Sequence, residues 1–114
     1  MTKADRRTVR KLADRAWKTE LQSALAEIGT AIAEMKIGLV SPFDVDQKIH
    51  EYHNGTARDL YKLYSGSNAW VGVCSAYYKG VLKEDDISEL SKELRCQIQE
   101  SAEHFARFEA ENKE

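Results

Sequence analysis

Proline, glycine and cysteine are all scarce in this chain. One proline and six glycines among 114 residues exclude collagen-like and low-complexity sequences, which are rich in both residue types. The two cysteines, Cys74 and Cys96, lack the Cys-x-x-Cys spacing of metal and redox motifs, and they are too few for a disulfide-stabilised secreted domain. Cys74 lies in a largely apolar run and is expected to be a small buried side chain. We therefore expect a fold that needs no disulfide or metal.

Long apolar runs are also missing. The longest stretch without charge, residues 63–78, is shorter than the roughly 20 residues that cross a bilayer, and serine, glycine and asparagine interrupt it. The basic residues at the start of the chain are not followed by an apolar segment, so no signal peptide is expected. These absences predict a cytoplasmic protein that does not enter a membrane.

Catalytic motifs are absent as well. The sequence contains no glycine-rich phosphate loop and no Gly-x-Ser-x-Gly nucleophile elbow. Cys74 has apolar neighbours, and Cys96 has only Arg95 beside it, so neither cysteine is a good candidate for a nucleophile. We expect a protein without catalytic residues and without a cofactor, apart from one metal-dependent alternative.

Helical periodicity is what the sequence does contain. Charged residues make up 32% and apolar residues 42% of a chain long enough for one domain, a composition typical of soluble helical proteins. Breaks are expected at Gly38, at Ser41-Pro42 and at residues 65–68, and the acids at 84–86 suit the first turn of a helix. The prediction is an all-α fold, a single small bundle with a long N-terminal helix, whose four helices span about 3–36, 42–64, 69–78 and 84–112 of residues 1–114.

The first predicted helix carries a regular apolar seam. Its members are spaced by four, three, four and three residues: Leu21, Leu25, Ile28, Ile32 and Met35. Such spacing is typical of helices that pack along their length. Upstream, the apolar positions shift phase between Trp17 and Leu21, as a four-residue insertion would produce. We expect the seam to mediate protein–protein association, either as a homodimer or with another helical protein, because a helix of this length projects beyond a small globule.

Two of the three histidines lie close together in the second predicted helix. Asp46, His50 and His53 are separated by four and three residues, so they share one side of a helix. Their order, His-Glu-x-His, differs from the His-Glu-x-x-His motif of zinc proteases, which excludes that class. One hypothesis is a site for a divalent transition metal, with His104 as a further ligand, in a metal-binding protein or small metal-dependent hydrolase. The favoured interpretation is an Asp46–His50 surface pair, with His53 as a hydrogen-bonded imidazole inside the apolar stripe.

Asn54-Gly55 follows these histidines and is a sequence that often ends a helix. The apolar register nevertheless continues through the glycine, from Ile49 to Thr56 and Leu60. We therefore expect one continuous helix that is kinked at most.

Charge is distributed unevenly, although the net charge is only −2. Residues 1–18 contain seven basic and two acidic side chains, whereas residues 84–114 contain four basic and ten acidic ones. A basic arm can bind nucleic acid, and the candidates would be Arg6, Arg7, Arg10, Lys11 and Arg15. A pI of about 5.9 and the lack of interleaved aromatic residues disfavour that alternative. We favour two helix surfaces of opposite charge that lie near each other or near a second subunit.

Overall fold

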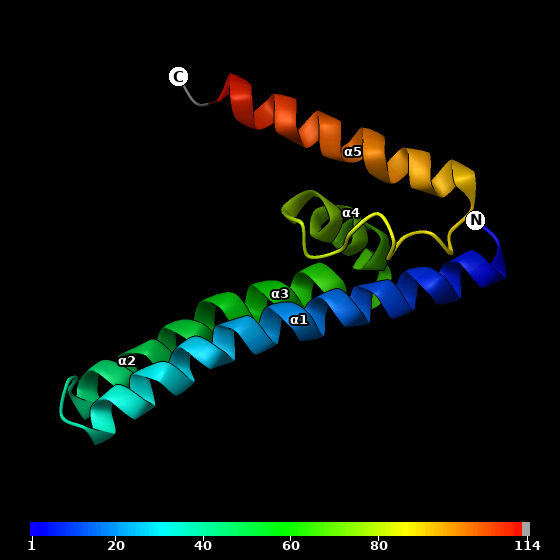
Figure 1. Cartoon of the computed structure of the whole chain (residues 1–114). Coiled ribbons are helices and arrows are strands. Elements are labelled where there is room, and N and C mark those ends of the chain that lie inside the picture. Colours follow the sequence, from blue (N-terminus) through cyan, green and yellow to red (C-terminus); the bar gives the residue numbers. More distant parts are fainter. Residues whose placement is uncertain (113–114) are drawn as a thin grey trace.

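The protein is built of α-helices joined by short turns (Figure 1). The computed structural model describes residues 1–112, and no strand occurs among them. The elements are α1 (Lys3–Lys36), α2 (Pro42–Glu51), the π turn η1 (Tyr52–Thr56), α3 (Ala57–Tyr64), the 3-10 turn η2 (Gly66–Asn68), α4 (Ala69–Lys79) and α5 (Lys92–Glu111). The all-α prediction with a long N-terminal helix is confirmed. Within this described part, no helix is long and apolar enough to cross a bilayer.

The turn between α1 and α2 is fixed by local chemistry. Gly38, with φ of 82°, ends α1 and donates its N–H to the carbonyl of Met35 at 3.0 Å. Ser41 caps α2 by accepting from the N–H of Phe43 at 3.0 Å, and Asp44 accepts from the N–H of Ser41 at 3.1 Å. The break predicted at Gly38 and Ser41-Pro42 is therefore confirmed.

A continuous helix made of α2, η1 and α3 runs back along α1 and forms a long antiparallel hairpin with it (Figure 1). Helical structure continues through Gly55, as its apolar register predicts. The π turn is closed by the N–H of Ala57, which donates to the carbonyl of Tyr52. Such a turn contains one residue more than an α-helical turn. The helix therefore absorbs Asn54-Gly55 without ending.

The core lies at the other end of the hairpin, where the first half of α1 meets α3, α4 and the start of α5. Its buried members are Val9, Leu12, Ala13, Ala16, Leu60, Tyr64, Val73, Cys74, Ala76, Leu82, Ile87, Leu90, Leu94 and Ile98. In its second half, α1 instead packs against α2, with Ala31 as its buried residue. The phase shift in the sequence does not coincide with this change of partner, because Trp17 and Leu21 both still pack against the core.

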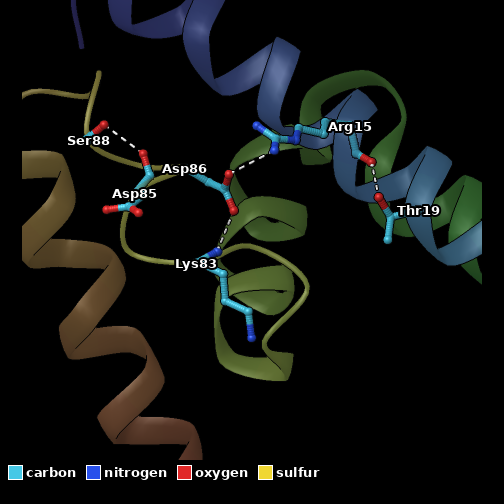
Figure 2. Close-up of polar contacts among 6 residues, drawn as sticks. All are labelled: Arg15, Thr19, Lys83, Asp85, Asp86 and Ser88. Carbon is cyan, nitrogen blue, oxygen red and sulfur yellow. Dashed lines mark hydrogen bonds and ion pairs between the residues drawn. The ribbon is translucent and has the colours of Figure 1, made fainter.

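The fourth predicted helix begins later than expected, because residues 84–91 form turns and α5 begins only at Lys92. Figure 2 shows the reason. The Asp86 carboxylate accepts from the N–H of Lys83 at 2.6 Å and forms an ion pair with Arg15 of α1 at 3.1 Å. The turns that follow place Ile87 and Leu90 in the core. The acids at 84–86 therefore belong to a packed connector between α4 and α5, and the prediction of a helix start near 84 is wrong.

The start of α5 is attached to the start of α1. The N–H of Ser91 donates to Asp5 at 3.3 Å, and this aspartate is itself buried. From there α5 packs on α4 through Leu94 and Ile98 and then diverges from α1 (Figure 1). Every described residue after Ala102 is exposed. The last turns of α5 thus project from the body of the molecule, and Tyr78 of α4 links them to it by packing on Phe105 and donating a hydrogen bond to Glu109.

Candidate functional site

One face of α1 is left uncovered by the rest of the chain. We call it the outer row; its residues, spaced alternately by four and three, are Arg7, Lys11, Asp14, Lys18, Leu21 and Leu25. Leu21 is half-buried and the other five are exposed. The buried side chains of the same helix segment, such as Leu12 and Ala16, lie on the opposite side of the helix. The outer row therefore faces away from the core, except for Leu21, which packs against its edge.

The apolar end of the outer row forms a shallow groove of about 880 Å³. Its lining residues are Asp14, Trp17, Lys18, Leu21, Gln22, Leu25 and Ala26. Trp17 makes an edge-to-face contact with Tyr61 of α3, with ring centroids 5.9 Å apart. Leu25 is 49% exposed and Tyr61 is 60% exposed. The groove thus presents leucine and aromatic surface to solvent, with Asp14 and Lys18 as its charged residues.

A polar cluster fixes the helices next to this groove. Glu20 of α1 accepts hydrogen bonds from the hydroxyl of Tyr64 in α3 and, at 2.7 Å, from the ammonium of Lys79 in α4. Tyr64 is fully buried, and this burial, together with the nearby Glu20 carboxylate, raises the pKa of its hydroxyl. Through these bonds the cluster ties α1, α3 and α4 together.

The predicted apolar seam is divided between two surfaces. Leu21 and Leu25 line the groove, whereas Ile28 lines a separate hollow beside Lys48 and Tyr52 of the α2–η1 segment. Ile32 and Met35 are half-buried. The five seam residues therefore do not form one open surface, and the open apolar part is the end nearest Trp17.

The predicted metal row is exposed. His50 Nε2 and Asp46 Oδ2 lie 3.4 Å apart, and their side chains are 65% and 69% exposed. His53 is also exposed, so its expected place inside the apolar stripe is wrong: it lies one position, or roughly 100°, beyond the half-buried Tyr52. His104 lies on α5 beside Phe105. Across residues 1–112, no group of three or more His, Cys, Asp or Glu side chains is arranged to hold a metal ion.

The five basic candidates have different roles in the structure. Arg10 donates to the carbonyls of Tyr64 and Gly66, the latter at 3.3 Å, where α3 ends. Arg15 pairs with Asp86, as described above. The other three, Arg6, Arg7 and Lys11, are exposed. Two of the five candidates thus stabilise the fold, and the exposed ones lie on or beside the outer row.

Sequence reasoning missed the contribution of Asp14, Trp17 and Lys18 to this surface. The signal was present, because the spacing of the seam continues upstream from Leu21 through 18, 14, 11 and 7. Upstream of Leu21, however, the residues on this face are charged, so hydrophobic periodicity alone does not reveal them.

The two thiols differ in environment, and their reactivity should differ accordingly. Burial raises the pKa of the Cys74 thiol, although a hydrogen bond with Ser101 opposes the shift, whereas Cys96 is exposed on α5. We expect a thiol reagent to modify Cys96 in the folded protein and Cys74 only after denaturant is added. Mass spectrometry of the labelled protein measures this order. Equal labelling of both cysteines in the native state would contradict the placement of Cys74 in the core.

Comparison with known proteins found no family, no curated protein and no solved structure that matches the chain.

Proposed function

We propose that the protein acts through protein–protein association, with the groove on α1 as its contact surface and a second copy of the chain as its partner. The observation that supports this is the groove itself, in which the exposed Leu25 and the half-buried Leu21 lie beside Trp17. Burying apolar surface contributes roughly 25 cal/mol per Å², and contiguous exposed apolar surface is a mark of association sites. The proposal therefore follows from the exposure of this surface.

The rigidity of the surface also favours association. Trp17 is held by its contact with Tyr61, and the neighbouring Glu20 is fixed by Tyr64 and Lys79. A surface that is ordered before binding loses less conformational entropy when a partner covers it. The groove is thus suited to bind without rearrangement of the helices around it.

The proposal is tested by placing charge in the groove. We expect the wild-type chain to be dimeric at tens of micromolar in analytical ultracentrifugation, and the double variant Leu21→Glu/Leu25→Glu to be monomeric, because two carboxylates would have to be desolvated in the contact. Leu25→Glu alone, at the more exposed position, should weaken the dimer with less risk to folding. A wild-type chain that is monomeric at this concentration would overturn the proposal.

The matched control is Leu39→Glu. Leu39 is 69% exposed at the far end of the hairpin and does not line the groove, so this variant adds charge without touching the proposed surface. It should remain dimeric. Circular dichroism and thermal melting of all variants separate a loss of association from a loss of folding.

A further inference from the structure

The projecting end of α5 carries a second uncovered row. We call it the arm row; its residues, spaced by four, four and three, are Glu100, His104, Phe108 and Glu111. All four are exposed, and Phe108 is 59% exposed. An adjacent side of the helix carries Phe105, which packs against Tyr78 of α4 at 5.7 Å. The arm row is therefore acidic and aromatic, and it is available to a partner.

The charges of the two rows are opposite. The outer row contains Arg7, Lys11 and Lys18 against one acid, whereas the arm row contains Glu100 and Glu111 and no Lys or Arg. Within residues 1–112, neither glutamate forms an ion pair. The two surfaces are thus complementary in charge, and each also offers apolar surface.

One copy of the chain cannot bring these surfaces together. The start of α5 is attached to the start of α1 by the Ser91–Asp5 hydrogen bond, and α5 then leads away, with its end farthest from α1 (Figure 1). The helix α4 lies between them and contacts both. The complementarity is therefore left unsatisfied within one copy, and a second copy would satisfy it.

We propose that the end of α5 from a second copy docks in the groove of α1, with Phe108 against Leu21 and Leu25. This inference rests on the proposed self-association and names the segment that fills the groove. Phe108 is the apolar anchor, because a large aromatic side chain in an apolar groove is a common source of binding energy. The acidic side chains face a lysine-rich helix and would be repelled by an anionic membrane or by nucleic acid.

The charge pattern also sets the direction of the docked helix. Phe108 and Glu111 are three residues apart, as are Leu21 and Lys18. In an antiparallel arrangement, Phe108 at Leu21 places Glu111 at Lys18, which is an attractive pair. A parallel arrangement would instead bring Glu100 close to Asp14, a like charge that already pairs with Arg10 at 3.0 Å, so no attractive pair would form there. The docked α5 segment therefore runs antiparallel to α1, and a two-fold dimer would form this contact twice.

A charge exchange tests both the partner segment and the direction. Lys18→Glu and Glu111→Lys should each raise the dimer dissociation constant about three- to tenfold, and the double variant should restore it close to the wild-type value. Phe108→Ala should raise it about tenfold or more. Sedimentation equilibrium measures these constants, and added salt should weaken the wild-type dimer. All three positions are exposed, so folding should be unaffected.

Glu103→Lys is the matched control, because Glu103 is an exposed acid of the same helix segment that lies roughly 140° around the helix from the anchor Phe108 and two turns away from Glu111. It should leave the dissociation constant unchanged. A dimer broken by Leu21→Glu/Leu25→Glu but indifferent to Phe108→Ala would overturn the docking of α5 and leave the proposed function standing. Failure of the double charge variant to recover would overturn the antiparallel contact. A wild-type monomer would overturn both proposals.

Discussion

Replacing Gly72 with alanine is expected to lower the free energy of unfolding by about 1–3 kcal/mol, although alanine is the better helix former. A Cβ atom at this position in α4 would lie 2.5 Å from Cδ1 of Tyr64 and 3.0 Å from the carbonyl oxygen of Leu63. Tyr64 is fully buried and bonded to Glu20, so its ring has little freedom to move. The added methyl group must therefore push α4 away from α3. Urea denaturation followed by circular dichroism measures the change.

Gly29→Ala is the control for this prediction. Gly29 also lies inside a helix, but a Cβ atom there would meet nothing within 4 Å. Only the helix propensity changes, so the variant should be more stable than the wild type by about 0.5–1 kcal/mol. Both variants should be measured at a concentration at which the chain is monomeric. Equal stabilisation by the two substitutions would show that α3 and α4 do not approach closely at Gly72.

Ile87→Ala is expected to cost about 2–5 kcal/mol, even though residue 87 lies outside every helix. Its side chain is fully buried in the core, together with Leu82 and Leu90 of the same connector. Removing three carbon atoms would leave a cavity that the surrounding helices can fill only in part. The same denaturation experiment measures the loss, and amide exchange should show faster exchange in the connector.

Leu39→Ala is the comparison for Ile87→Ala. Both substitutions shorten an aliphatic side chain in a segment between helices, but Leu39 is 69% exposed at the tip of the hairpin. Its truncation should change stability by less than about 0.5 kcal/mol. A similar small effect at Ile87 would mean that the connector does not contribute to the core as the structure indicates.

The helix ends that could be predicted are those that depend on nearby residues. Ser41 and Asp44 cap α2 within a single turn, and Gly38 ends α1 through its own backbone angle. The start of α5 could not be predicted in this way, because Asp86 is engaged by Arg15, a residue distant in sequence. In the sequence, the spacing of Ile87, Leu90 and Leu94 is also compatible with one apolar stripe of a helix. They lie in turns because that conformation places both side chains in the assembled core.

The candidate site could be predicted only in part, for a related reason. The spacing of Leu21 and Leu25 is visible in the sequence, and both line the groove, Leu25 as an exposed and Leu21 as a half-buried residue. The sequence does not say which of the seam residues the hairpin partner will cover, and α2 covers the side that includes Ile28. The π turn similarly depends on how the helix meets α1. Which seam residues are covered and which are exposed is therefore determined by packing between helices and not by the local sequence.

The bond between Asp5 and Ser91 has a consequence for how the protein is made. The first half of α1 is covered in part by α3, and the rest of its apolar cover comes from α4, the connector and α5, which are translated later. During synthesis the hairpin can form first, while Val9, Leu12 and Ala16 still lack the part of their cover that α4, the connector and α5 supply. A nascent chain that stalls before the connector emerges would therefore expose apolar surface of α1. That surface could be bound by chaperones or by other nascent chains on the same mRNA.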